Sequence, residues 1–288
     1  MIIDISHTLN VPAGTGARAV EHLLLTPLSG ATQTVKDWRI EMPGIETAAR
    51  FTDAYGNRAI LVTQAKPEGE IKISIRGQVE VEDRNGVLGR LPGEPVVGLY
   101  RRVTALTEAD PRIVDGFAQA ERYGTGRIAL LHAVMDRIGE LYRFEGTREP
   151  APEEAGQHQQ QSSEAGTQSQ SQTAAEASIH SSRTPANAAV FAHAFVGTIR
   201  ALGLPARYVT GYFAGDEDTP AAFHAWAEAY DDSLGWIAFD AALGLCPTDR
   251  HVRIAVGLDG LSTQAVRVVP ADGEAKLVEI SVVAQSAQ

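Results

Sequence analysis

Cysteine is nearly absent from this chain, whose 288 residues include only Cys246. A single thiol excludes an internal disulfide framework and any zinc or iron–sulfur site built from several cysteines. The eight histidines offer no pair at helical ligand spacing, so we expect no metal and no other cofactor. Residues Met1 to Asp4 lack the basic and apolar stretches of a signal peptide, and no run approaches the roughly 18 apolar residues of a membrane helix. These absences predict a cytoplasmic protein.

Positive charge is scarce as well. The sequence has 25 lysine and arginine residues against 36 aspartate and glutamate residues, which gives a net charge of −11. Such a surface does not attract polyanions broadly, so nucleic acid and membrane are not expected partners. Apolar residues are plentiful by contrast, at 44% of the chain. They can form a sizeable core, and the length accommodates two domains.

Residues 1–98 carry short strand-like segments separated by turns. Apolar and polar residues alternate along three of these segments, which predicts strands with one exposed face. Between the second and third segments, a Gly-Asn pair suits a tight turn, and we interpret Asp53 and Asn57 as turn residues. The range 1–98 is therefore expected to form a β-sandwich-like domain. The three alternating segments are Ile2–Leu9, Val35–Met42 and Ile71–Val81.

Residues 99–288 are expected to form a second domain, which begins with helices. Apolar residues recur at helical spacing along Asp110–Tyr123 and Arg127–Tyr142. The composition then changes, because residues 149–182 contain almost no apolar residue beyond alanine and many glutamines. We interpret 149–182 as a disordered insertion in this domain. The alternative is a tether that becomes ordered on a partner.

Ordered structure is predicted to resume at Thr184-Pro185, which reads as an N-cap followed by proline at the first helical position. The helix that follows has an apolar stripe made of Phe191, Phe195, Ile199 and Leu202. Several alternating segments follow this helix, at Tyr208–Tyr212, Phe223–Tyr230, Trp236–Phe239, Val252–Val256 and Lys276–Val283. Helices followed by an antiparallel sheet make the fold class α+β.

Two of the predicted strands bring a histidine and an aspartate toward each other. If Phe223–Tyr230 and Trp236–Phe239 form an antiparallel hairpin, the expected register places His224 opposite Asp240. A carboxylate beside an imidazole fixes its tautomer and stabilises the imidazolium, as the orienting and basic groups of a hydrolase triad do. A shift of one residue would turn the two side chains to opposite faces.

Four separated segments closely resemble the bacterial transglutaminase-like proteins of the papain-like superfamily, in residues and in order. They are Ala201–Tyr212, His224–Trp226, Gly235–Asp240 and Asp249–Gly257. The stretch from Asp53 to Val81 is similar to the β-rich domain that precedes the core in those proteins. The resemblance implies a papain-like core of helices packed on an antiparallel sheet. It also implies a chemistry in which a cysteine thiolate attacks an amide and forms a thioester.

The nucleophile of this family is missing from the chain. In the family it is a cysteine at the start of the long helix, in a run such as Gly-Val-Cys-Gln-Asp-Phe-Ala-His. The matching run here is Asn187–His193, which retains Phe-Ala-His and has Ala188 at the cysteine position. His224 and Asp240 then occupy the inherited triad positions, with Trp226 as a binding residue of the groove. Cys246 lies past Asp240, beyond a loop, and we expect it to be an inert, small hydrophobic residue.

Three functions remain open from the sequence. The favoured one is an inactive homologue, a pseudoenzyme that binds a peptide or protein in the family's groove. The second is an amide hydrolase or acyl-transferase that uses His224 and Asp240 with a displaced nucleophile. The third is a scaffold whose 149–182 insertion recruits a partner, such as an active relative or a peptide-bond-forming enzyme.

Overall fold

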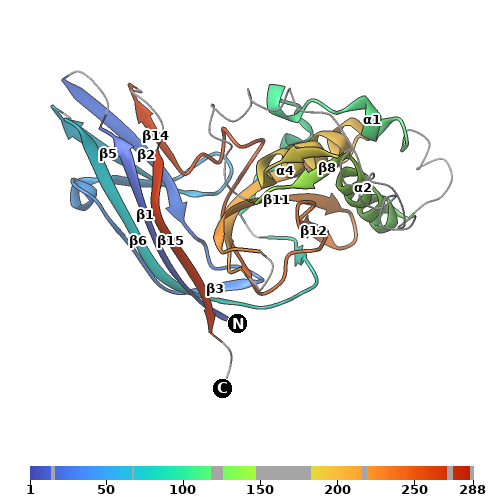
Figure 1. The fold of residues 1–288 in the computed structure, drawn as a ribbon, viewed down its shortest axis with the longest axis horizontal. Coiled ribbons are helices and arrows are strands. Elements are labelled where there is room, and N and C mark those ends of the chain that lie inside the picture. Colours follow the sequence, from blue (N-terminus) through green and yellow to red (C-terminus); the bar gives the residue numbers. More distant parts are fainter. Residues whose placement is uncertain are drawn as a thin grey trace, which may run out of the picture.

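The computed structural model describes residues 1–13, 17–66, 68–91, 93–117, 126–146, 183–215, 219–270 and 275–285. The expected insertion at 149–182 lies outside these residues. Figure 1 shows two parts, a pair of antiparallel sheets on one side and helices packed on a curled antiparallel sheet on the other. This arrangement confirms the predicted α+β class.

The first part is a sandwich of two four-stranded antiparallel sheets with the orders β15-β1-β6-β3 and β14-β2-β5-β4. Inward residues of both sheets, including Leu9, Leu23, Val62 and Ile73, form one apolar core. The alternation seen in the sequence is therefore the alternation between this core and solvent. The strands are β1 (Ile2–Pro12), β2 (Arg18–Thr26), β3 (Gln33–Glu41), β4 (Ala49–Thr52), β5 (Arg58–Ala65), β6 (Glu70–Val81), β14 (Val266–Val269) and β15 (Lys276–Gln285).

The two ends of the chain meet in this sandwich. The C-terminal strands β14 and β15 pair with β2 and β1, and they complete the two sheets. Conversely, β7 (Val87–Gly89) belongs to the first 98 residues but pairs with β12 in the sheet of the second part. Both connections cross the expected boundary between residues 98 and 99. A strand-like period identifies a strand but does not identify its neighbour, so the sequence alone could not place these three strands.

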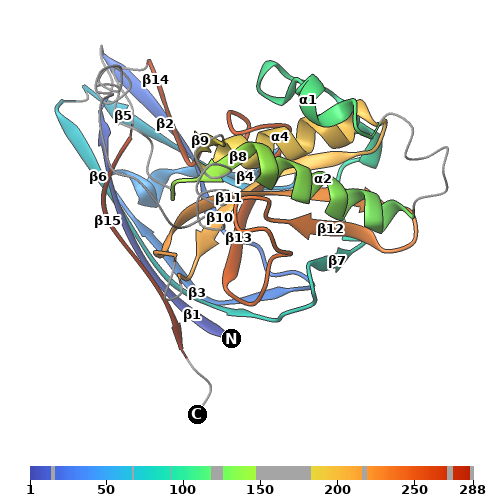
Figure 2. The same ribbon diagram turned by 45° about the vertical axis from the view of Figure 1, so that its right-hand side comes forward.

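The second part has a five-stranded antiparallel sheet in the order β13-β10-β11-β12-β7. One face of β11 presents Ala225, Ala227 and Ala229, whose small side chains allow the helix α4 to pack closely. Figure 2 shows α2 and α4 lying together on this sheet. The elements are α1 (Pro111–Val114), α2 (Arg127–Leu141), β8 (Tyr142–Phe144), β9 (Thr184–Ala186), α4 (Ala188–Ala201), β10 (Ala206–Phe213), β11 (Ala222–Asp231), β12 (Gly235–Phe239) and β13 (His251–Gly257). Short 3-10 turns occur at Ile45–Thr47, Val97–Arg101 and Ala105–Thr107.

Two helix boundaries differ from the predictions. The helix expected at Asp110–Tyr123 has only four residues in the described part, Pro111–Val114. The helix expected to start at Thr184 starts at Ala188, and Asn187 caps it by accepting a hydrogen bond from the backbone N–H of Val190. Thr184–Ala186 instead forms a strand that pairs in parallel with β8. The residues that the sequence predicted as the helix cap and first turn are therefore part of a strand. Among the described helices, none has the length and apolar character needed to cross a membrane.

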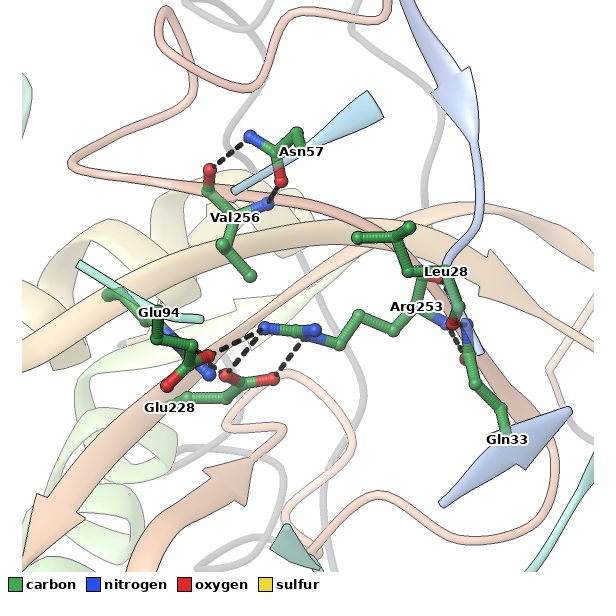
Figure 3. A network of polar contacts seen from close by, with 8 residues as sticks. Leu28, Gln33, Asn57, Glu94, Glu228, Arg253 and Val256 are labelled. Atoms are coloured by element: carbon green, nitrogen blue, oxygen red, sulfur yellow. Dashed lines mark hydrogen bonds and ion pairs between the residues drawn. The ribbon is translucent and has the colours of Figure 1, made fainter. Parts of the chain in front are cut away.

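Side-chain amides from the sandwich bind the free edge of β13. The Gln33 amide accepts the backbone N–H of Arg253 at 2.8 Å and donates to its carbonyl at 2.9 Å. Asn57 makes the same pair of bonds with Val256, both at 2.8 Å (Figure 3). Asp53 accepts the N–H of Asn57, so the predicted turn is present, and its asparagine also joins the two parts of the molecule. These amides satisfy backbone groups that an edge strand otherwise leaves unpaired.

Candidate active site

His224 and Asp240 meet at the end of the β11–β12 hairpin. The His224 Nε2 lies 2.6 Å from Asp240 Oδ2, and both side chains are buried. The register differs from the prediction by two residues, because Glu228 pairs with Ala238 and Tyr230 with Trp236. A shift of two residues keeps every side chain on its predicted face. The histidine and aspartate therefore meet diagonally, past the last paired residues of the hairpin.

Asp240 accepts hydrogen bonds from four directions. Its Oδ2 also lies 3.2 Å from Nε2 of His251, and its Oδ1 accepts the backbone N–H groups of Ala242 and Leu243. Complete burial alone would raise the pKa of Asp240, but His224 and His251 lower it further, and the pKa is well below its usual range. Asp240 is therefore an anion that can orient the His224 ring.

The hydrogen bonds fix the tautomer of His251. Its Nδ1 accepts the backbone N–H of Thr248 at 3.1 Å, so this nitrogen carries no proton. Its Nε2 must then donate to Asp240, and His251 is neutral. The other ring nitrogen of His224, Nδ1, has no hydrogen-bond partner in the described part of the chain.

Ala188 is the first residue of α4, at the position where the resemblance expects a cysteine. It is buried, with an exposed fraction of 3%. A helix N-terminus is a site at which backbone N–H groups and the helix dipole stabilise a thiolate or another anion. The local geometry for an activated nucleophile is thus present, but the side chain is a methyl group without a reactive atom.

Ala188 and His224 both line a cavity of about 650 Å³. It lies between the two parts of the molecule, because α4, β10 and β11 line one side while β1, β14 and β15 line the other. The polar lining includes Thr210 and Gln264, and Leu9, Val266, Leu277 and Ile280 supply apolar surface. A cavity of this size and mixed character is typical of a ligand site.

His7 is a residue of this cavity that the sequence analysis did not single out. It lies on β1, and its Nδ1 is 2.9 Å from the hydroxyl of Tyr212. Burial lowers the pKa of His7 to about 4, so the imidazole is neutral at pH 7. The alternation of β1 places His7 on the same buried face as Ile5 and Leu9. A histidine on an otherwise apolar face is the sequence feature that could have indicated His7.

His224, Asp240 and His251 also have the residue types of a metal site. One ligand atom from each lies within 4.8 Å of the other two, and all three residues are buried. The 2.6 Å between His224 Nε2 and Asp240 Oδ2 is nevertheless a hydrogen-bond distance. Ligand atoms about 2.0–2.2 Å from one zinc ion in tetrahedral geometry lie well over 3 Å apart. The arrangement therefore fits a hydrogen-bonded cluster better than a metal centre.

Two other residues from the sequence analysis lie away from the cavity. Trp226 is 2% exposed and packs with Trp236 and Tyr100, so the structure does not bring it to the cavity that His224 lines. Cys246 lies against Gly86 on the far side of the β12 loop. Burial and the nearby carboxylate of Asp83 raise the pKa of the Cys246 thiol, which disfavours the reactive thiolate.

Two family descriptions match separate parts of the chain. Residues 151–241 match the core of the transglutaminase-like superfamily, and residues 13–80 match the bacterial transglutaminase-like N-terminal region. The chain belongs to the transglutaminase-like superfamily. The core match contains Ala188, His224 and Asp240, whereas His251 lies beyond it. The N-terminal match contains Gln33 and Asn57, the two amides that bind β13 in the second part of the molecule.

Several individual proteins are also similar to this chain. The uncharacterized protein ML0607 of Mycobacterium leprae is 24% identical, over 82% of this chain and 80% of its own. The crystal structure of a proposed cysteine protease from Cytophaga hutchinsonii is 20% identical, covers 98% of this chain and 89% of its own, and has a TM-score of 0.61, which shows the same fold. The periplasmic domain of TgpA from Pseudomonas aeruginosa is 14% identical over 80% of this chain and 72% of its own, with a TM-score of 0.36.

Proposed function

We propose that this transglutaminase-like protein binds a peptide or protein segment in the cavity between its two parts and does not carry out cysteine-dependent acyl transfer or amide hydrolysis. The observation that carries the proposal is Ala188 at the first position of α4, lining the same cavity as His224. The orienting and basic groups and the helix N-terminus are in place, and the nucleophile is not. The partner that supplies the segment is a protein such as an active relative or a peptide-bond-forming enzyme.

The cavity supports binding because both parts of the molecule contribute to it. His7 and Leu9 come from β1, and His224 comes from β11. An apolar cluster that includes Ile5, Tyr212 and Val252 fixes the sandwich against the core, so the two walls are held in one arrangement. A preformed cavity avoids part of the ordering cost that a flexible site pays when a ligand binds.

A displaced nucleophile is the second candidate, and the intact contact between His224 and Asp240 favours it. The hydroxyls that line the cavity in the described part of the chain belong to Thr210 and Tyr208. The Thr210 hydroxyl donates to the carbonyl of Thr263, and burial raises the pKa of Tyr208 far above neutrality. Neither hydroxyl is activated in this arrangement, so we favour the binding function.

A defined peptide library tests both candidates. The library should contain glutamine side chains, be offered with a primary amine, and be recovered for mass spectrometry after incubation with the wild-type protein. We expect retention of a subset of peptides and no deamidated, cleaved or amine-linked product. Product that disappears in the His224→Ala variant would contradict the proposal and support the displaced nucleophile.

A matched pair of variants locates the binding. Ala188→Trp fills the cavity with an indole, whereas Val190→Trp adds the same group to a residue of α4 that is 39% exposed. We expect Val190→Trp to retain the peptides that the wild type retains and Ala188→Trp to lose them. Equal retention by both folded variants would place the binding elsewhere.

A further inference from the structure

His224 has one nitrogen that nothing in the described part of the chain satisfies. The residue is 3% exposed, and Nε2 is held by Asp240, which does not line the cavity. Because His224 itself lines the cavity, Nδ1 is the nitrogen available to a ligand. A buried polar atom without a hydrogen-bond partner is unfavourable, so a ligand that hydrogen-bonds to Nδ1 gains binding energy from this contact.

The charge of Asp240 is not balanced by a cation among the groups that hold its carboxylate. Asp240 is a fully buried anion, and the groups that hold its carboxylate oxygens are His224, His251 and backbone N–H groups. His251 is neutral, because its Nδ1 accepts from Thr248. A ligand carboxylate at Nδ1 would place a second anion on the other side of the His224 ring from Asp240. Two flanking anions favour the doubly protonated ring, so in the complex Nδ1 donates a hydrogen bond to the ligand.

The N-terminus of α4 lines the same cavity. This helix has 14 residues, long enough for a substantial dipole with its positive end at Ala188. The side chain of Asn187 accepts from Val190, and in the described part of the chain no acceptor receives the backbone N–H groups of Ala188 and Ala189. Both alanines line the cavity and add nothing polar of their own.

We propose that the ligand of this cavity carries a carboxylate, which binds between Nδ1 of His224 and the N-terminus of α4. This inference rests on the proposed function and names the chemical group that occupies the vacated nucleophile position. A carboxylate oxygen accepts from His224 Nδ1–H, and the backbone N–H groups of α4 are directed to the same negative charge. The ligand supplies the anion that a cysteine thiolate would have supplied.

The rest of the ligand is apolar. The wall opposite α4 includes Leu9, Val266, Leu277 and Ile280, and Leu277 is 57% exposed although it is a leucine. An acid with an apolar body buries this surface while its carboxylate meets His224. Two sources have this chemistry, the C-terminal carboxylate of a peptide that ends in an apolar residue and a free organic acid.

Calorimetric titration with 4-phenylbutyrate and its uncharged amide tests the carboxylate directly. We expect the acid to bind wild-type protein at least about tenfold more tightly than the amide, as a charge-assisted hydrogen bond provides. The tripeptide N-acetyl-Ala-Ala-Phe, as free acid and as amide, provides the second comparison. A tighter tripeptide acid identifies a peptide C-terminus as the source, and a tighter 4-phenylbutyrate identifies a free acid.

The variant pair Ala188→Asp and Ala188→Asn provides an independent test on the same protein. Ala188→Asp supplies an internal carboxylate at the proposed anion position, so it should unfold at a higher temperature than Ala188→Asn and lose at least about tenfold in affinity for 4-phenylbutyrate. The uncharged Ala188→Asn controls for side-chain size. Indistinguishable unfolding temperatures and affinities of the two variants would overturn the proposal.

The outcomes separate this inference from the function on which it rests. Equal affinity for acid and amide, or no binding of either acid at millimolar concentration, overturns carboxylate recognition and leaves peptide binding through other groups intact. Hydrolysis or amine exchange of the amidated probes would instead overturn the proposed binding function itself.

Discussion

Strand β11 carries two buried ionic clusters, and they differ in how their charge is balanced. At Glu228, two arginines face two glutamates. At His224, one carboxylate is shared by two imidazoles, and one nitrogen next to a cavity is left over. The charges of the first cluster balance within the chain, and the cluster braces the fold, whereas the second leaves Nδ1 of His224 without a partner at the 650 Å³ cavity. An unpartnered atom at a large cavity, rather than burial or charge alone, marks the candidate site.

The Glu228 cluster connects distant elements. Arg207 of β10 is fully buried, lies 2.6 Å from both Glu228 and Glu94, and stacks 3.8 Å from the ring of Trp236. Arg253 of β13 lies 3.0 Å from Glu228. Figure 3 shows the two side chains pointing toward each other. Burial raises the pKa of Glu228, but the two arginines lower it further, so Glu228 is ionised. Each charge in the cluster has an opposite charge beside it.

The largest expected effect comes from breaking this cluster. Glu228→Gln leaves Arg207 buried with less compensating charge, and we expect the free energy of unfolding to fall by about 3–5 kcal/mol in urea denaturation. Glu80→Gln is the matched control, because Glu80 pairs with Lys36 at 2.6 Å on the surface. The exposed pair should contribute nothing measurable. Equal losses in the two variants would show that burial does not distinguish the clusters.

Replacing Asp240 should have a smaller effect on the free energy of unfolding, and this effect should depend on pH. Its folded pKa lies below its ordinary value of 3.8, so its contribution to stability is present above that pH and is lost as the pH falls toward the folded pKa. Asp240→Asn should lower the free energy of unfolding at pH 7 by about 1–3 kcal/mol and flatten its decline below pH 4. Denaturation curves that decline in parallel for wild type and variant would contradict this account of Asp240.

Glu21 is a buried carboxyl that has no hydrogen-bond partner on another residue in the described part of the chain. We expect its replacement to have the smallest effect on stability, with the opposite sign. Glu21 faces the sandwich core, where burial raises its pKa above the ordinary 4.5. Folding then favours the protonated form, so stability is highest below pH 4.5 and declines as the pH rises through the folded pKa. We expect Glu21→Gln to be more stable than wild type at pH 7 by about 1 kcal/mol or less, after allowance for solvent screening. A less stable Glu21→Gln at pH 7 would contradict this reading.

The contact between His224 and Asp240 could be predicted from the sequence, but the residues that surround it could not. The period-two alternation predicted that His224 and Asp240 lie on one face of the sheet. The observed register differs by two residues, and a shift of two leaves each side chain on the same face. The same reasoning could not position Trp226, which shares a face with His224 but packs against Trp236 in the core. Facing direction is a property of one strand, whereas lining a cavity depends on elements from elsewhere in the chain.

Long-range partners explain the remaining differences. Thr184 reads as a helix cap in isolation, but β8 recruits it into a strand, and Asn187 caps the helix three residues later. Asn57 reads as a turn residue, yet its amide binds Val256, which lies 199 residues away. His7 enters the cavity only because β1 pairs with the C-terminal strand β15, which lines the same wall. In each case the local sequence does not identify the distant partner.

The central claim is that this site lacks only the thiol, and Ala188→Cys in a Cys246→Ser background tests it most directly. The measurement is the rate of alkylation by iodoacetamide as a function of pH, with Val190→Cys in the same background as the exposed control on the same helix. We predict that the thiol at position 188 reacts well below pH 7, because His224 and the N-terminus of α4 lower its pKa, and that the control titrates near the ordinary value of about 8.5. Identical profiles for the two thiols would contradict the claim.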